Sequence, residues 1–174
     1  MKTSFEDTLA RHVPPGVDGK RELIWLAVGG ALCLLYSLSF FIVYLNHYQA
    51  LFVWDGTARV LNTEAVMPDF IALLGNSLTG FLILALCLPA LIFYHYAYHY
   101  RDSMSIYLMK RLPDRWELHR RCISLPFCGI LACCGAAFIL LLVYFGVYML
   151  LTPSACLAPD QWQKIWIAFL GVVK

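Results

Sequence analysis

Three long stretches without a charged side chain constrain the fold of this 174-residue chain more than any other feature. The stretches free of Lys, Arg, Asp and Glu are Leu23–Trp54, Phe70–Tyr100 and Cys122–Pro159. A helix needs about 20 predominantly apolar residues to cross the hydrocarbon core of a bilayer. Each stretch is long enough for one crossing, and together they predict transmembrane helices at Leu23–Tyr44, Phe70–Tyr94 and Leu125–Leu151.

Composition favours the same class of protein. Hydrophobic residues make up 61% of the chain and charged residues only 14%, whereas soluble domains usually carry about 25% charged residues. With a mean hydropathy of +0.69, the chain has too little polar surface to cover a water-soluble core. Disordered and fibrous proteins are excluded as well, because they require low hydrophobicity or strict repeats. We therefore predict an all-α integral membrane protein with three transmembrane helices.

Basic residues are distributed unevenly between the two predicted sides of the membrane. Ten lie before the first predicted span or between the second and the third: Lys2, Arg11, Lys20, Arg21, Arg101, Lys110, Arg111, Arg115, Arg120 and Arg121. The opposite side has only Arg59, Lys164 and Lys174. Because cytoplasmic segments are enriched in Lys and Arg, we expect the N terminus in the cytoplasm and the C terminus outside a bacterial cell membrane. A cleavable signal peptide is not expected, because residues 1–22 carry four acidic side chains.

This orientation divides the chain into a cytoplasmic N-terminal segment (1–22), a transmembrane domain (23–151) and an extracytoplasmic tail (152–174). Within the tail, Gln161–Lys174 is too short to cross a bilayer. Its apolar residues recur on one helical face: Trp162, Ile165, Trp166, Phe169, Leu170 and Val173. We predict an interfacial helix with Trp at the headgroup level. A truncated fourth span is the alternative.

Small residues at helical spacing offer a close-packing surface in each predicted span. The three sets are Gly29 with Gly30 and Cys33, Gly75 with Thr79, and Gly129 with Cys133 and Ala136. We interpret each set as a helix-packing face, although a chance distribution explains any single set nearly as well.

The cores of the predicted spans contain no Asp, Glu, Lys or Arg. Pumps, channels and transporters normally need such groups within the membrane, so an autonomous transporter is not expected. His95 and His99 share one helical face and could bind a metal, but the tyrosines around them are more typical of an aromatic belt at the inner interface. No metal or other cofactor is therefore expected in this chain, and the two histidines are weak candidates only. The chain also lacks a GxxxxGK phosphate loop, and no nucleic-acid partner is expected.

The connection between the second and third predicted spans, residues 101–121, is the segment most typical of partner binding. Ser103 or Ser105 can cap a short helix that ends before Pro113, because a residue before proline disfavours the helical conformation. A connection of this length and apolar content is more than a simple tether.

Asp114 and Glu117 have capping-box spacing and predict a second helix that leads into the third span. The resulting helix–turn–helix elbow exposes apolar and basic residues: Met104, Tyr107, Leu108, Met109, Lys110, Arg111, Arg115 and Trp116. Such a surface binds either anionic lipid headgroups or the groove of a partner. The ordered capping residues favour a partner, because adsorption to lipid does not require them.

The run from Ser105 to Cys122, together with Thr152-Pro153, Cys156-Leu157 and Gln161-Trp162, resembles small membrane proteins of Firmicutes that are encoded beside an ABC-type ATPase. The resemblance covers roughly Tyr94 to Trp166. It implies a membrane subunit of an ABC transporter, with ATP and Mg bound by the ATPase partner.

The same resemblance implies a role for the elbow. Its apolar residues would fill a cleft on the ATPase, and its basic residues would pair with the acidic rim of that cleft. A second membrane subunit or a homo-oligomer would also be needed, because ABC membrane subunits commonly have more than three spans.

The leading hypothesis is therefore a non-catalytic membrane subunit of an ATP-driven transport complex. A membrane anchor or regulatory subunit that recruits a soluble partner without transport is the alternative. A small redox membrane subunit that uses His95 and His99 is the third and least favoured hypothesis.

Overall fold

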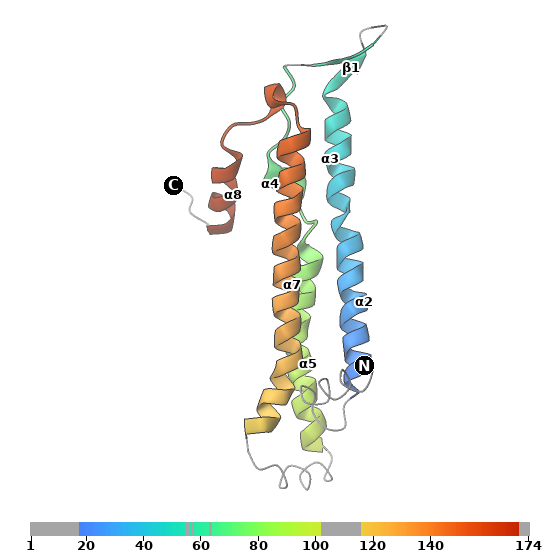
Figure 1. Cartoon of the computed structure of the whole chain (residues 1–174), viewed down its shortest axis with the longest axis vertical. Coiled ribbons are helices and arrows are strands. Elements are labelled where there is room, and N and C mark those ends of the chain that lie inside the picture. Colours follow the sequence, from blue (N-terminus) through green and yellow to red (C-terminus); the bar gives the residue numbers. More distant parts are fainter. Residues whose placement is uncertain (1–17, 55, 57, 63, 102–115, 171–174) are drawn as a thin grey trace, which may run out of the picture. The chain divides into compact units, whose positions relative to one another are not determined.

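The computed structural model describes residues 18–54, 56, 58–62, 64–101 and 116–170 (Figure 1). These residues are mostly helical, as predicted. The elements in chain order are α2 (Gly19–Ser37), α3 (Ser39–Ala50), β1 (Phe52–Trp54), β2 (Arg59–Leu61), α4 (Phe70–Leu74), α5 (Thr79–Arg101), α7 (Trp116–Leu151), the 3₁₀ turn η1 (Ser154–Cys156) and α8 (Gln161–Leu170).

Within the described residues, two helical segments are long and apolar enough to cross a membrane. They are Gly19–Ala50, with 32 residues, and His119–Leu151, with 33 residues. Only 11% of the most apolar window in each segment is buried. A core helix of a soluble protein is mostly buried, so this low value separates both segments from such helices.

The helix predicted over Phe70–Tyr94 is broken, and its prediction as one continuous span is wrong. Helix α4 ends at Leu74, and α5 begins at Thr79. Gly75 has a φ of +45°, which is costly for a residue with a side chain. Its N–H makes the last helical hydrogen bond of α4, to the Ile71 carbonyl at 3.0 Å. The positive φ of Gly75 then ends the helix. The apolar part of α5 that remains, Thr79–His95, is shorter than the two candidate spans.

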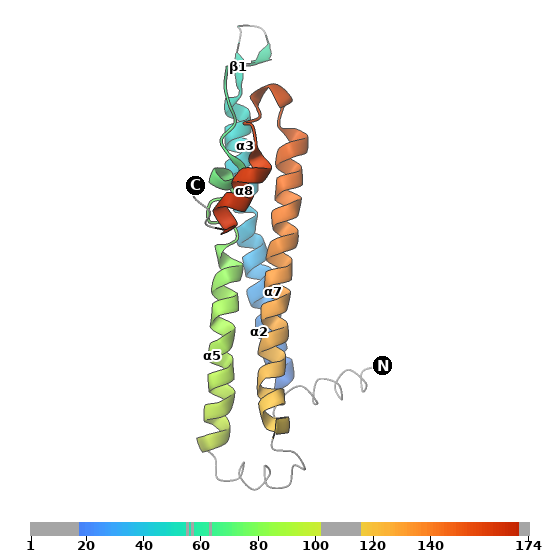
Figure 2. The same ribbon diagram turned by 90° about the vertical axis from the view of Figure 1, so that its left-hand side faces the viewer.

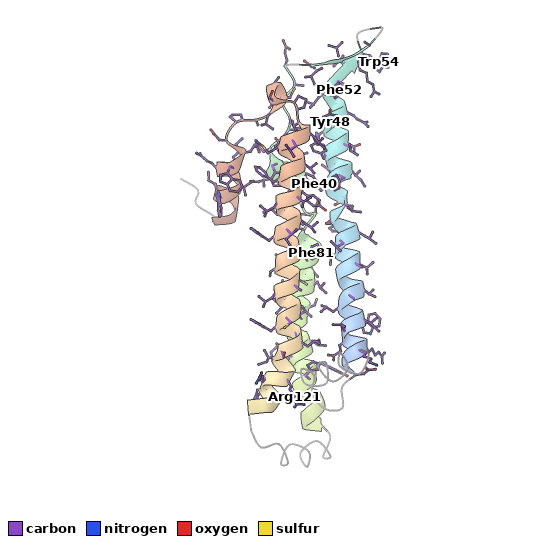
Figure 3. All side chains as sticks on the ribbon, in the orientation of Figure 1. Phe40, Tyr48, Phe52, Trp54, Phe81 and Arg121 are labelled. Atoms are coloured by element: carbon purple, nitrogen blue, oxygen red, sulfur yellow. The ribbon has the colours of Figure 1, made fainter. Side chains whose placement is uncertain are left out.

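A short antiparallel hairpin interrupts the helical pattern and was not predicted. Strands β1 and β2 pair Phe52 with Leu61, Val53 with Val60 and Trp54 with Arg59. Trp54 lies on the hairpin at the end of α3 (Figure 3).

The chain divides into two compact units. The first unit contains Met1–Cys33 and Phe81–Ala136, and the second contains Leu34–Gly80 and Ala137–Lys174. Each unit therefore combines segments that lie far apart in the sequence.

The first unit packs closely at two of the predicted small residues. A Cβ atom on Gly129 would lie 3.0 Å from Leu88 Cδ1 and 3.3 Å from Leu26 Cδ2, so parts of α2, α5 and α7 meet there. A Cβ atom on Gly29 would lie 3.2 Å from Leu84 Cδ1. These contacts confirm close packing at Gly29 and Gly129, whereas Gly30, in the same predicted set as Gly29, has open space beside it. The predicted face of Gly75 with Thr79 is wrong, because Gly75 terminates α4 and Thr79 begins the next helix.

The second unit has a core rich in aromatic side chains, of which Phe40 is labelled in Figure 3. Its buried residues are Phe40, Tyr44, Leu51, Met67, Phe70, Leu73, Leu74, Tyr144, Tyr148, Cys156 and Ile165. Phe40 is the centre of an aromatic cluster, since its ring stacks on Tyr144 at a centroid distance of 4.5 Å and also contacts Phe41, Tyr44 and Phe70.

Each buried tyrosine hydroxyl in this core has a hydrogen-bond partner, as buried polar groups require. Tyr144 Oη lies 2.8 Å from Ser37 Oγ, and Tyr44 Oη lies 3.3 Å from Thr152 Oγ1. Tyr148 Oη donates to the Pro68 carbonyl at 3.1 Å. These contacts fix the rotation of the helices as well as their separation.

The predicted helix in the tail is confirmed as α8, and its interfacial location stays a prediction. Helix α8 lies beside α4 (Figure 1, Figure 2). Ile165 is buried in the core of the second unit, whereas Trp162 and Trp166 are about half exposed. The predicted apolar face is therefore divided between a core contact and an exposed aromatic pair.

Candidate functional site

Most of the predicted docking surface lies outside the described residues. This applies to Ser103, Met104, Tyr107, Leu108, Met109, Lys110, Arg111, Asp114 and Arg115. Trp116 and Glu117 form the start of α7, but their side chains are likewise outside the described part. The elbow therefore stays a prediction, as does its role in docking.

The structure does describe a polar cluster in the first unit, formed by the helices on either side of the elbow and by α2. Glu22 lies in the first turn of α2, His95 lies on α5, and Cys122 lies on α7. His95 is fully buried. Its Nε2 atom lies 2.7 Å from Glu22 Oε1, and its Nδ1 atom lies 3.4 Å from the Cys122 carbonyl oxygen. One imidazole ring thus connects three helices.

Local sequence explains why Glu22 lies at the start of a helix. Asp18 Oδ1 accepts hydrogen bonds from the backbone N–H groups of Lys20 at 3.2 Å and Arg21 at 3.4 Å, which is the geometry of an N-terminal cap. An acidic residue in the first turn is also favoured by the helix dipole. The cap and the dipole together hold the Glu22 carboxylate at the end of α2.

A proline explains why the Cys122 carbonyl is available to His95. In an α-helix, the carbonyl of one residue accepts the N–H of the residue four positions later. That residue is Pro126, which lies inside α7 and has no N–H to donate. The Nδ1 atom of His95 lies where a replacement donor is needed.

The same contacts bear on the two histidines that were weak metal candidates. Both ring nitrogens of His95 face protein oxygens, and the side chain of His99 lies outside the described residues. In the part of the chain that the structure describes, no group of three or more His, Cys, Asp or Glu residues could hold a metal ion. A metal at His95 would have to displace Glu22 or the Cys122 carbonyl.

A second polar cluster attaches α8 to α4 in the second unit. Gln161 Oε1 accepts the Phe70 N–H at 3.0 Å and so satisfies a donor at the start of α4. Asp69 Oδ1 accepts from Gln161 Nε2 at 2.9 Å and from Lys164 Nζ at 2.7 Å. These hydrogen bonds, that of Lys164 first, hold the pKa of the Asp69 carboxyl below its usual value.

Acidification is expected to weaken this attachment of α8. The pKa of Asp69 is lower in the folded state than in the unfolded state, so its carboxylate stabilises the fold above about pH 4. That contribution is lost as the pH falls through the folded-state pKa. The effect should be small, because partly exposed ion pairs contribute about 0–1 kcal/mol. Fluorescence of Trp162, whose ring lies 5.5 Å from that of Phe145, would report the change.

The control for this acid transition is Asp69→Asn, which cannot titrate at this position. It should remove the fluorescence step below about pH 4. An equal step in the variant and in the unchanged protein would contradict the assignment to Asp69.

No family model, curated protein or solved structure matches this chain. The similarity to ABC transporter subunits therefore stays a prediction from the sequence.

Sequence reasoning missed the link between Glu22 and His95. The two residues lie 73 positions apart, and nothing in the pattern of either segment indicates that they meet. One signal was available for the third group of the cluster, the Cys122 carbonyl. A proline inside an apolar helix frees the carbonyl four residues earlier. Applied to Pro126, this rule selects Cys122 as a carbonyl that requires a new donor.

Proposed function

We propose that this chain is a non-catalytic membrane subunit of an ATP-driven transport complex. Its cytoplasmic elbow, residues 101–121, would dock an ABC-type ATPase that binds ATP and Mg. Movement of the ATPase would then reach the membrane through α5 and α7, which flank the elbow.

The membrane part of the proposal is supported by apolar side chains exposed along both candidate spans. Trp25 and Leu35 on α2 are each 65% exposed, and Leu150 on α7 is 85% exposed. A surface of this kind is stable against lipid or another apolar partner and unfavourable in water. The excess of basic residues at one end of the predicted spans supports a cytoplasmic N terminus.

The coupling part of the proposal is supported by one observation, the position of His95. Its ring joins α5, the helix before the elbow, to α7, the helix after it, through the Cys122 carbonyl. A contact to Glu22 extends the connection to α2. A force applied at the elbow would therefore act on a linked set of helices rather than on a loose loop.

Co-purification tests the docking proposal. The tagged full chain, extracted in mild detergent, is expected to recover an ABC-type ATPase, and Leu108→Asp should abolish that recovery. An aspartate in the apolar part of the elbow would have to be buried without a partner, which is strongly unfavourable.

Val53→Asp is the matched control, because Val53 is an exposed residue of β1 and lies outside the elbow. It should leave recovery unchanged. Undiminished ATPase recovery with Leu108→Asp would contradict docking through the elbow. Recovery of a soluble partner that is not an ATPase would instead favour a membrane anchor.

A further inference from the structure

We propose that Glu22, His95 and the Cys122 carbonyl form a proton-binding site that closes the first unit. Closure here means that the loaded site holds α2, α5 and α7 together. The ligand is a proton taken from the surrounding solution. The site is a property of this unit whether or not an ATPase docks at the elbow.

The contacts of the His95 ring determine how many hydrogens the site requires. Nε2 faces a carboxylate oxygen at 2.7 Å, and Nδ1 faces a carbonyl oxygen at 3.4 Å. A carboxylate and a carbonyl only accept hydrogen bonds, whereas a neutral imidazole has a single N–H to donate. A neutral ring beside an ionised Glu22 would therefore place one nitrogen lone pair against an oxygen lone pair. An imidazolium, with two N–H groups, satisfies both oxygens.

The bound proton stays on the ring, as an imidazolium beside the Glu22 carboxylate. Nε2–H then donates to Glu22 Oε1, and Nδ1–H donates to the Cys122 carbonyl. The site holds one proton more than a neutral His95 beside an ionised Glu22. Release transfers that proton to water and leaves the negative charge on Glu22.

Burial makes the loss of this proton unfavourable for the closed arrangement. The Glu22 side chain is only 12% exposed. Its second oxygen, Oε2, is buried and has no hydrogen-bond partner among the described residues. A carboxylate in this position depends on the positive ring beside it, because an unpaired buried charge is costly. Release of the proton should therefore separate the first turn of α2 from α5.

Other charged and titratable groups lie within four residues of the site along the same three helical segments. On α2 they are Lys20 and Arg21, with Asp18 as the capping residue before them. On α5, the Tyr94 ring lies 6.1 Å from the His95 ring. On α7 they are His119, Arg120, Arg121 and the Cys122 thiol. Their charges set the pH range of release, whereas the two contacts of the ring create the site.

Nitrogen NMR of the histidine side chains tests the proposal directly. The full chain, labelled with ¹⁵N-histidine in lipid nanodiscs, should show one imidazole with hydrogens on both nitrogens near neutral pH. His95→Gln identifies this signal by removing it. Glu22→Gln, which keeps the shape and removes the charge, should abolish the doubly protonated signature. Glu64→Gln is the matched control at an exposed carboxylate of the second unit and should leave it unchanged.

Pro126→Ala provides a second variant that leaves Glu22 and His95 intact. Alanine supplies the missing N–H to the Cys122 carbonyl, so that carbonyl no longer needs His95 as its donor. The doubly protonated signature should weaken over the pH series. A signature in Pro126→Ala equal to that of the unchanged chain would overturn the role of the freed carbonyl.

Hydrogen exchange in the first turn of α2 tests closure. After correction for the intrinsic effect of pH, protection should fall over the same pH interval in which the His95 signature disappears. A His95 ring with one N–H throughout the pH series would overturn the proton-binding site, even if no variant folds. Protection that does not change with pH would overturn the closure of the helices.

Discussion

Replacing Phe40 with alanine should lower the free energy of unfolding of the second unit by about 3 kcal/mol, because Phe→Ala changes in a packed core typically cost 3–5 kcal/mol. Phe40 is completely buried and contacts four other aromatic rings. Its removal leaves a cavity and loses the stacked contact with Tyr144. We expect the lower end of the range, because lipid solvates an exposed apolar ring better than water does.

Equilibrium unfolding in mixed detergent micelles, followed by circular dichroism, would measure this loss. Phe138→Ala is the matched control, since Phe138 belongs to the same unit but is 60% exposed. It should change the free energy of unfolding by much less. Equal losses for the two variants would show that the Phe40 cluster does not determine the stability of the unit.

Replacing Gly129 with leucine should destabilise the first unit by about 3 kcal/mol or more, at or above the usual range for inserting methylene groups into a packed core. A Cβ atom alone would already lie 3.0 Å from Leu88 Cδ1, and the leucine adds three further carbons. Leu88 and Leu26 can move slightly, but the larger side chain forces the helices apart. Unfolding in the same micelles would measure the effect.

Gly135→Leu is the control for Gly129→Leu, because it makes the same change on the same helix where a Cβ atom meets nothing within 4 Å. It should be close to neutral in the isolated chain. A large loss in both variants would attribute the effect to leucine on α7 rather than to the close helix contact.

Features that depend on local sequence could be predicted well. The apolar stretches gave two helices with the length and composition of membrane spans, and the amphipathic tail gave α8. The break after Leu74 could also have been predicted, because Gly75 and Asn76 are both common turn residues. Hydropathy concealed it, since a window average does not respond to a single glycine. The hairpin had a comparable signal in Asp55-Gly56.

Features that depend on distant residues could not be predicted. The alternation of polar and apolar residues says nothing about which tyrosine hydroxyl meets Ser37, 107 residues away. From the sequence, His95 was interpreted as part of an aromatic belt. Its partners could not be recognised, because one lies in the first turn of α2 and the other is a carbonyl that Pro126 leaves free. Such contacts depend on how the helices pack, and the packing is settled by the whole chain.

The attachment of α8 has a consequence for biosynthesis. The Phe70 amide at the start of α4 is satisfied by Gln161, which the ribosome adds 91 residues later. The buried Ile165 completes the same core still later. These contacts cannot form before Gln161 and Ile165 have been synthesised. The second unit therefore stays unfinished until translation has passed residue 165, so a chain stalled before that point displays an open core to the quality-control proteases of the cell.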